Sequence, residues 1–340
     1  MASGFVSRVA ARVLSTLIDP TIVLSFDRTG YRIHQLGFRD DDLDVDMTGR
    51  VCVVTGANSG LGYAAALALA TRAADVWLLC RNRQRGAAAL KTIKRTTRNA
   101  HVHLAVVDMA SRRAIRAFAA RFAAERVDVL VNNAGVLPDQ RSETEDGIEL
   151  TWATNVVGPF LLTSLLVPRL VAAPHGRIIT VSSGGMYTQK LVLDDPQSRT
   201  PPFDGVKAYA LTKRAEVVLS ELWAERLRHT RVTANSMHPG WADTPSVRAS
   251  LPRFYRVMRS RLRTPAEGAD TIVWLAVCQH LAGRTGLFWF DRRPCSTHYL
   301  PWTREAPRDR ERLWTLCCKL AEVPDSGQPS AISSQPNTRR

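Results

Sequence analysis

The sequence predicts an α/β fold, a doubly wound parallel sheet with helices on both faces. From residue 51 onward, short apolar runs alternate with alanine-rich or leucine-rich stretches of helical length. The runs are apolar throughout rather than at every second residue, so we expect strands that are buried on both faces. A glycine-rich turn follows the first run, as at the start of a βαβ unit.

The expected strands lie between helical stretches in a regular order. They are VCVV (51–54), DVWLLC (75–80), HVHLAVV (101–107), VDVLV (127–131), RIITV (177–181) and RVTANSM (231–237). Connections from strand to helix to parallel strand are right-handed, which favours the doubly wound arrangement over other layered folds.

The length of 340 residues suits one large domain with extensions. We expect a domain over 48–292, an N-terminal amphipathic extension over 1–47 and a C-terminal extension over 293–322. The last segment, 323–340, is polar and rich in serine and proline, so we expect it to be disordered.

The formal charge of +15 does not by itself indicate a nucleic-acid-binding protein. The excess is spread along the chain as arginine beside abundant alanine, and no RNA-binding or DNA-binding motif occurs. The six cysteines form no CxxC pair and no cluster at metal-ligand spacing, so we expect reduced thiols and no metal site. The sequence contains no run of 18 apolar residues, so we expect no helix that spans a membrane.

The first 18 residues have an amphipathic helical pattern without an acidic residue. Its apolar side carries Phe5, Val6, Val9, Val13, Leu14, Leu17 and Ile18. Three interpretations stay open: a helix that packs on the domain, an interfacial membrane helix, and an organellar presequence. We therefore expect a cytoplasmic protein, with or without peripheral membrane association, and keep a mitochondrial location as the alternative.

The turn TGANSGLG after the first strand predicts a dinucleotide site. It leads from a strand into an alanine-rich helix, where absent side chains let the backbone approach a pyrophosphate and the helix N-terminus favours negative charge. The expected contacts come from Gly56, Ser59, Gly60, Leu61 and Gly62. The alternative is a tight turn with a structural role alone.

The end of the second strand predicts the choice of cofactor. An NAD enzyme is expected to place Asp or Glu there for the ribose 2′-hydroxyl, but this chain has Arg81. A guanidinium suits a 2′-phosphate, so we expect NADP (NADPH), the alternative being a solvated arginine. Asp108, followed by Met109, ends the third strand, where its carboxylate can accept from the adenine amino group or cap the next helix.

The segment YALTK places Tyr209 and Lys213 four residues apart, and therefore on one face of a helix. An unperturbed tyrosine pKa near 10 is poorly matched to proton transfer at neutral pH, so a catalytic tyrosine needs a neighbour that stabilises its phenolate. The spacing also occurs by chance, and alone it decides nothing.

Five motifs in order make the chain similar to the short-chain dehydrogenase/reductase family, with a Rossmann fold. They are TGANSGLG, VNNAG (131–135), TNVVG with Asn155, ITVSSGG with Ser183, and YALTK. The resemblance covers about residues 48–292. CRN after the second strand and the long gap between Ser183 and Tyr209 resemble the retinol-dehydrogenase-type branch.

This resemblance implies a catalytic tetrad for hydride transfer. Tyr209 is the general acid in carbonyl reduction, Lys213 stabilises its phenolate and holds the nicotinamide ribose, and Ser183 polarises the substrate carbonyl. Asn155 holds a water in a proton relay; the alternative is an amide that the core satisfies locally. Ser182 adjoins Ser183, and strand alternation points the two side chains to opposite faces.

The resemblance also assigns further cofactor contacts. Asn133, Ala134 and Gly135 are expected to line the adenosine side of the cleft. Pro239, Gly240 and Thr244 in HPGWADT match the turn over the nicotinamide. A Pro-Gly turn also suits an ordinary connection at that place.

The substrate should be a carbonyl or alcohol that segments outside these motifs select. An insertion (185–208) begins beside Ser183, and a basic stretch (246–263) carries an apolar stripe at helical spacing. That stretch is interpreted either as a lid helix packed on the domain or as a membrane-surface helix beside a lipophilic substrate. The alternative function is a non-catalytic NADP-binding regulator. VVLSELWAERL (217–227) suits either the core or a homodimer interface.

Overall fold

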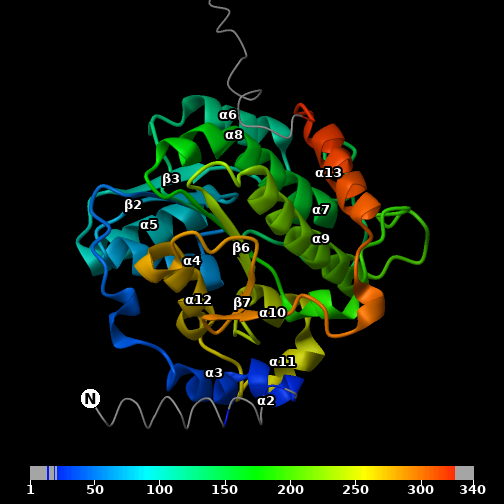
Figure 1. Ribbon diagram of the computed structural model, residues 1–340, viewed down its shortest axis with the longest axis horizontal. Helices are drawn as coiled ribbons and strands as arrows, with labels where there is room; N and C mark the ends of the chain where they lie inside the picture. Colours follow the sequence, from blue (N-terminus) through cyan, green and yellow to red (C-terminus); the bar gives the residue numbers. More distant parts are fainter. Residues whose placement is uncertain (1–13, 15–18, 20, 326–340) are drawn as a thin grey trace, which may run out of the picture.

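The computed structural model describes Leu14, Asp19 and residues 21–325. Within these residues, one sheet of eight strands has the order β3-β2-β1-β4-β5-β6-β7-β8. All neighbouring strands are parallel except β7 and β8. The six predicted strands are β1 (Val51–Thr55), β2 (Asp75–Cys80), β3 (Val102–Val106), β4 (Val129–Asn132), β5 (Arg177–Val181) and β6 (Thr233–Met237). The predicted doubly wound sheet is confirmed (Figure 1).

Helices cover both faces of the sheet. One face carries α4 (Gly60–Thr71), α5 (Arg83–Thr97) and α12 (Pro265–Val277), and the other carries α6 (Arg112–Arg121), α8 (Gly158–Ala172) and α9 (Gly205–Arg226). Consecutive residues of β1 alternate between two buried clusters: Val53 belongs to one, and Cys52 and Val54 to the other. This alternation explains why the strand is apolar throughout.

The order of the strands reverses between β1 and β4. The chain reaches β3 at one edge of the sheet and then returns to β4, which lies beside β1. Sheets of this kind bind ligands outside the carboxyl ends of the strands at such a reversal. The residues of the predicted site follow β1, β2, β3, β4, β5 and β6, which places them at this end.

Two strands that the apolar runs do not predict extend the sheet. They are β7 (Phe288–Phe290) and β8 (Arg293–Cys295), of three residues each. A two-residue turn joins them, with φ of 46° at Asp291 and 59° at Arg292, as in a type I′ hairpin. Their shortness hides them from any periodicity test, and Pro294 suits only an edge strand because proline cannot donate a ladder hydrogen bond.

The described part of the N-terminal extension packs on the domain. It forms α2 (Ile22–Phe26) and α3 (Arg28–Gln35), followed by the 3-10 helix η1 (Asp40–Leu43). The carboxylate of Asp27 accepts hydrogen bonds from the amides of Thr29 (2.7 Å) and Gly30 (3.2 Å), which caps α3. Most of the amphipathic pattern over 1–18 lies outside the described residues, so its three interpretations stay predictions.

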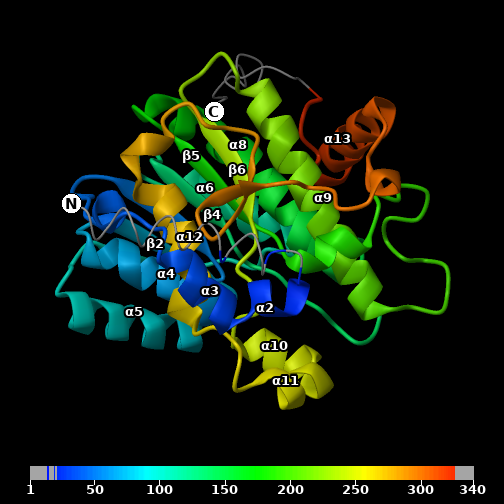
Figure 2. The same ribbon diagram turned by 60° about the horizontal axis from the view of Figure 1, so that its bottom comes forward.

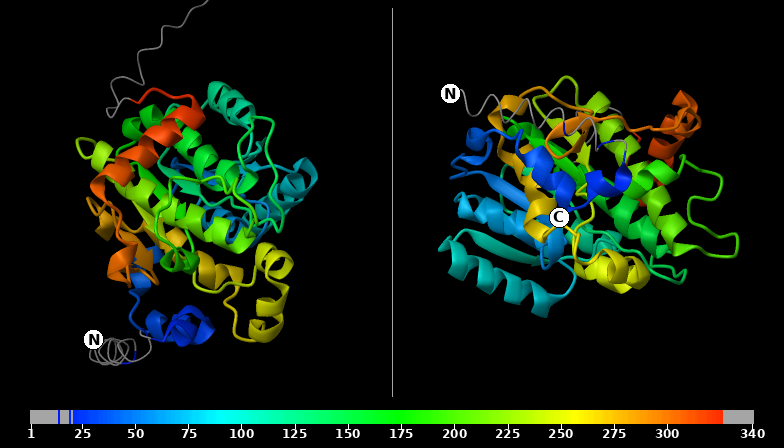
Figure 3. Two further views of the ribbon diagram at one scale, coloured as in Figure 1. Left: turned by 90° about the vertical axis from the view of Figure 1, so that its right-hand side faces the viewer. Right: turned by 90° about the horizontal axis from the view of Figure 1, so that it is seen from below.

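The basic stretch after β6 forms two short helices instead of one. They are α10 (Pro245–Ser250) and α11 (Pro252–Met258), and Pro252 opens the second because its fixed φ suits a first helical position. The ring of Phe254 packs edge-on against Trp241 at 5.2 Å between centroids, while Val257 is 75% exposed. Figures 2 and 3 show these helices beside α2, and the Arg28 amide donates to the Arg261 carbonyl at 2.9 Å.

The C-terminal segment belongs to the core of the domain. After η4 (Gln279–Leu281) and η5 (Pro301–Thr303), α13 (Pro307–Ala321) lies along α8 and α9. Trp314 packs against Phe160 at 4.9 Å and Trp223 at 4.8 Å between ring centroids. The apolar stripe of α9 is therefore core that α13 covers. The predicted disorder of 323–340 falls outside the described residues except for 323–325, where the Val323 amide bonds to the Cys318 carbonyl.

The structure describes one long apolar helix and all six cysteines. The helical run Leu150–Ala172 is long and apolar enough to cross a membrane by composition, but 72% of its most apolar window is buried inside the protein, as in a core helix. The six cysteines, all among the described residues, form no disulfide, and only Cys295 is partly exposed.

Candidate active site

The glycine-rich turn between β1 and α4 has no room for side chains. Gly56 adopts a φ of 67°, a conformation that favours glycine. A Cβ on Gly62 would lie 2.4 Å from Nδ2 of Asn133 and 2.6 Å from the carbonyl oxygen of Gly56. Ser59 precedes α4 without a side-chain cap, which leaves the first amides of the helix facing the end of the sheet. This arrangement fits a phosphate group.

Thr55, the first residue of TGANSGLG, has no predicted role, but it joins this turn to the end of β4. Its hydroxyl oxygen accepts hydrogen bonds from the amides of Asn133 (2.9 Å) and Ala134 (3.0 Å) and donates to the Val131 carbonyl (3.3 Å). The side chain of Asn133 donates to the Thr55 carbonyl at 2.8 Å. Asn133 thus braces the glycine turn. A threonine ending a buried apolar strand is the signal that could have indicated this role.

The loop after β6 closes over the same turn. A Cβ on Gly60 would lie 3.3 Å from Cγ2 of Thr244, so Thr244 lies against the start of α4, near Leu61. The hydroxyl of Thr244 accepts from the Val247 amide at 3.3 Å and caps α10. The predicted contact of Thr244 with the carboxamide or the pyrophosphate of the cofactor stays a prediction.

Arg81 follows β2, and Asp108 and Met109 follow β3. They differ in their contacts with the rest of the protein. Arg81 is exposed at the end of β2, and it makes no hydrogen bond or ion pair to any other described residue. Asp108 accepts a hydrogen bond from the Ala110 amide at 2.9 Å, which braces the turn before α6. The N-cap of α6 is Ser111, not Asp108. Met109 is buried beside α8.

Asn155 lies in a wide helical turn, η2 (Ala153–Val157), between α7 (Leu150–Trp152) and α8. Its buried amide accepts from the Val136 amide (2.9 Å) and donates to the Val136 carbonyl (3.2 Å) and to Oγ1 of Thr212 (2.9 Å). It therefore ties the end of β4 to α9, which carries Tyr209 and Lys213. Single turns of π-helix are frequent at functional sites.

Tyr209 and Lys213 lie on one side of α9, as their spacing predicts. Nζ of Lys213 is 5.4 Å from the centroid of the Tyr209 ring. A Cβ on Gly135 would lie 3.4 Å from Oδ1 of Asn155 and 3.5 Å from Nζ of Lys213. Gly135 therefore lies next to Asn155 and Lys213, two residues of the predicted tetrad.

The two serines after β5 point in different directions. The hydroxyl of Ser182 donates to the Lys213 carbonyl at 2.8 Å and is buried. The hydroxyl of Ser183 accepts from the Gly185 amide at 3.2 Å and opens η3 (Gly184–Thr188). Gly185 lies between Ser183 and Ala210, the neighbour of Tyr209. Ser183 is thus the less buried of the two serines, and its catalytic role stays a prediction.

Glu216 is a charged site residue that the motifs miss. It lies one turn after Lys213 on α9, and its two carboxylate oxygens are 2.9 and 3.0 Å from Nζ of Lys213. Burial alone would lower the pKa of Lys213, but the charges of Glu216 and Tyr209 outweigh it and hold that pKa above its usual value. Its place three residues after Lys213, on the same helix face, was the available signal.

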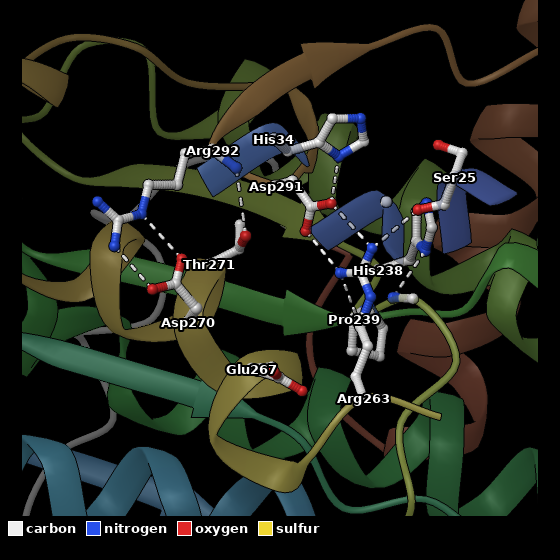
Figure 4. A network of polar contacts seen from close by, with 12 residues as sticks. Ser25, His34, His238, Pro239, Arg263, Glu267, Asp270, Thr271, Asp291 and Arg292 are labelled. Carbon is white, nitrogen blue, oxygen red and sulfur yellow. Dashed lines mark hydrogen bonds and ion pairs between the residues drawn. The ribbon is translucent and has the colours of Figure 1, made fainter. Parts of the chain in front are cut away.

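A buried polar network joins the N-terminal extension to the site (Figure 4). The Arg263 guanidinium bonds to the Asp291 carboxylate at 2.6 and 2.9 Å and to the carbonyls of Ser25 and Asp27 at 2.9 and 3.1 Å. It also reaches the carbonyl of Pro239, in the predicted cofactor loop, at 3.4 Å.

Phe26 connects the extension to two loops of the site. A Cβ on Gly184, next to Ser183, would lie 2.6 Å from the Phe26 ring. The same ring is 4.5 Å from the ring of His238 between centroids, and the Phe26 carbonyl accepts from the Trp241 amide at 2.8 Å. The extension thus packs against the loops that carry Ser183 and Pro239. No local motif indicates this role.

Known proteins are similar to this chain over most of its length. Dehydrogenase/reductase SDR family member 12 of Bos taurus is 42% identical over 299 residues, covering 87% of this chain and 94% of that protein. The stretches ITVSSGGM, PFDG and SMHPGWADTP resemble this relative. Retinol dehydrogenase 12 of Homo sapiens is 35% identical over 284 residues, covering 82% and 89% of the two chains.

Solved structures share the fold. A protein from Mycobacterium paratuberculosis superposes with a TM-score of 0.67 at 26% identity, covering 83% of this chain and 97% of that one. A short chain dehydrogenase of Escherichia coli complexed with NADPH superposes with a TM-score of 0.61 at 24% identity, covering 75% and 100%. The sequence pattern of the short chain dehydrogenase family matches residues 50–253. The chain therefore belongs to the short chain dehydrogenase family of oxidoreductases.

Proposed function

We propose that this protein is an NADP-dependent oxidoreductase that reduces a lipophilic carbonyl compound. The observation that carries the proposal is the convergence of Tyr209, Lys213 and Asn155 beside Gly135, at the reversal of the strand order. In the same crevice lies a glycine turn that fits a pyrophosphate. This combination suits proton transfer beside a bound dinucleotide.

The residues present fit the dinucleotide. The turn at Gly56 and Gly62 is a cradle that a Cβ would fill, and Thr244 lies over its start. Arg81 is exposed and has no partner among the described residues, which supports a role in holding the 2′-phosphate of NADP. When bound, NADPH supplies the hydride.

The protein's own residues would supply the proton and the polarisation. Tyr209 would donate its phenolic proton to the carbonyl oxygen while Ser183 donates a hydrogen bond to the same atom. The ammonium of Lys213 would stabilise the phenolate that forms. Asn155 would hold the end of β4 and α9 in register around these groups.

We base the lipophilic class of substrate on a relative, and two segments border the loop that follows β4. The hydroxyl of Ser250 on α10 donates to the Leu137 carbonyl at 2.8 Å, and the start of α9 touches the carbonyl of Pro138 at Gly205. α10 and the insertion thus border the loop after β4. The name of the related human retinol dehydrogenase 12 points to a lipophilic alcohol or aldehyde for that protein, and we extend this class to the present chain.

Peripheral membrane association would deliver such a substrate. Ile22, Val23 and Leu24 on α2 are exposed, and so is Val257 on the neighbouring α11. Exposed arginines of α11, among them Arg253 and Arg256, adjoin this apolar surface and suit an anionic membrane. Flotation with anionic liposomes at low salt tests this, and failure to float would exclude it.

A homodimer would need a surface other than the apolar stripe over 217–227. α13 covers the apolar side of α8 and α9 through Trp314, Phe160 and Trp223. Sedimentation equilibrium of the full chain measures whether a dimer forms at all.

Two experiments test the catalytic proposal. Binding of NADPH and NADH is compared by fluorescence, with Arg81→Asp as the variant; equal affinities for the two in the parent would contradict the choice of NADP. A panel of retinal, steroid ketones and quinones is then assayed with NADPH, and Tyr209→Phe should abolish turnover. Tight binding of NADPH without turnover of any panel member would instead favour the non-catalytic regulator.

A further inference from the structure

A pocket of about 370 Å³ opens at the end of the sheet opposite the candidate active site. Its lining comes mainly from the residues at which β1, β4, β5 and β6 begin, and from the end of α12 together with η4. The candidate active site lies where the same strands end, so the length of the strands separates the two places. Sites for small molecules in proteins usually have volumes of about 300 to 1,000 Å³, so this pocket is large enough for a compact ligand.

The pocket combines a buried apolar wall with positive charge. The buried residues of the lining are apolar except for Asp128; they are Met47, Val129, Ala276, Val277 and Leu281. Three arginines also line the pocket: Arg50 and Arg177, which are half-buried, and Arg231, which is exposed. Against these three guanidinium groups the lining holds one carboxylate, that of Asp128. The lining therefore fits a ligand with an apolar body and a negative group.

Arg177 stands at the first position of β5, with most of its donors unused. It is in register with Val129 of β4 and Thr233 of β6, so the three side chains lie on the face of the sheet that α12 covers. One nitrogen of its guanidinium, Nη1, donates to the Leu275 carbonyl of α12 at 2.8 Å. A guanidinium has five N–H donors, and within the described part of the chain Arg177 makes no other side-chain hydrogen bond and no ion pair. Its remaining nitrogens are not among the fully enclosed polar atoms, so they are open to the pocket.

The one carboxylate of the lining is already committed to other groups. Asp128 accepts a hydrogen bond from the Val51 amide at 2.9 Å. It also pairs with Arg50 at 3.7 Å and with Arg126 at 3.4 Å. Burial lowers the pKa of Arg177, and the positive charge of Arg50 adds to that lowering. The charge of Arg177 is therefore not compensated by any residue that the structure describes.

A structural role explains only part of this arrangement. Leu275 lies in the last turn of α12, where a cation interacts favourably with the helix dipole, so Arg177 stabilises the end of that helix. This role uses one N–H of Arg177 and does not involve Arg231. Arg231 lies two residues before Thr233, on the strand beside β5, and forms no ion pair with another described residue. Because neighbouring strands are about 5 Å apart, two arginine side chains can reach one anion from these positions.

We propose that the pocket binds a small organic anion, with its carboxylate or phosphate group on Arg177 and Arg231 and its apolar body against the buried wall. Guanidinium groups match both kinds of head group through paired N–H donors. The apolar body would leave water on contact with the wall, which favours binding. None of the lining residues belongs to the predicted dinucleotide or catalytic sites, so the inference does not depend on the proposed function.

Titration calorimetry of the full chain with octanoate and with octyl phosphate tests the pocket. Each should bind once per chain, also in the presence of saturating NADPH, and the tighter of the two identifies the preferred head group. Uncharged 1-octanol should bind about tenfold more weakly than octanoate or worse, because hydrogen bonds to a charged group are the stronger ones. Inorganic phosphate should bind more weakly than octyl phosphate, because it has no apolar body.

Three variants locate the binding. Arg177→Met should weaken the binding of both octyl anions by about tenfold or more, and Arg231→Met should weaken it as well. Arg95→Met is the matched control: Arg95 is exposed on α5 without an ion-pair partner among the described residues, so its loss removes the same charge elsewhere and should leave binding unchanged. If Arg177→Met does not fold, because Arg177 also stabilises the end of α12, Arg231→Met decides the question.

A parent that binds neither octyl anion would overturn the inference. Equal affinities of the parent, Arg177→Met and Arg231→Met would also overturn it, as would binding that NADPH displaces, since the anions would then occupy the candidate active site. A parent that binds octanoate in the pocket but binds neither NADPH nor NADH would refute the proposed function alone.

Discussion

Replacing Asp291 by asparagine tests whether the N-terminal extension is part of the folded domain. The Asp291 carboxylate is buried between Arg263 at 2.6 and 2.9 Å and Nδ1 of His34 at 2.6 Å. Burial opposes its ionisation, but Arg263 and His34 outweigh burial and lower the pKa of Asp291 from 3.8 to about 2. One pKa unit equals about 1.4 kcal/mol, so these partners stabilise the ionised fold by about 2 kcal/mol.

Asp291→Asn should lower the free energy of unfolding by about 3 to 5 kcal/mol at pH 6, because it also leaves the buried Arg263 without a counter-charge. Urea denaturation of the full chain measures this difference. Asp194→Asn is the control, since Asp194 meets Arg312 on the surface with 90% of its side chain exposed, and it should cause no measurable change. A loss below about 1 kcal/mol in Asp291→Asn would refute the reasoning.

The stability that Asp291→Asn loses should depend on pH, because the pKa of His34 is raised and the pKa of Asp291 is lowered. Burial would lower the pKa of His34, but hydrogen bonds to Asp19 and Asp291 raise it above 6.5. The share of stability that depends on charged His34 is present below pH 6.5 and is lost as the pH rises through that higher value. The pKa of Asp291 is lowered, so its share is present above pH 3.8 and is lost toward pH 2. The difference between parent and variant should therefore be largest between about pH 4 and 6.5.

Three further substitutions probe other parts of the structure. Phe26→Ala should cost about 3 to 5 kcal/mol of stability and reduce kcat more than NADPH affinity, because it removes support under Gly184 beside the cleft; equal kcat would contradict this. Thr55→Val leaves two backbone amides after β4 without an acceptor and should weaken NADPH binding in a fluorescence titration, with about 1 to 3 kcal/mol lost in thermal stability. Trp314→Ala should cost about 3 to 5 kcal/mol in urea unfolding, whereas an unaffected midpoint would mean that α13 is dispensable.

Local sequence patterns were sufficient for the six strands β1 to β6 and for the relative placement of Tyr209 and Lys213. Strand residues such as Cys52, Val53 and Val54 must be apolar on both faces, so the burial of a parallel sheet is visible in the sequence itself. The helical spacing of Tyr209 and Lys213 placed them on one side of α9. Glycine positions are equally local, since Gly56 needs a positive φ whatever surrounds it.

Long-range contacts were invisible to those patterns. β7 and β8 are three residues each and become strands only because β6 offers an edge for Phe288 and Trp289. The basic stretch predicted as one amphipathic helix is two, because Pro252 starts a new one. Asp108 braces a turn, and Ser111 is the N-cap of α6, although either side chain could cap a helix.

The sequence by itself determined the family, six of the eight strands and the identity of the predicted tetrad, because each depends on residues close together in the chain or on motifs in a set order. The tertiary structure decided which charges meet. Arg263 binds Asp291 and the backbone of the N-terminal extension, and Lys213 binds Glu216, in both cases within the buried interior. A charged group is buried only where a partner compensates for its lost hydration, and folding alone brings such partners together across the chain.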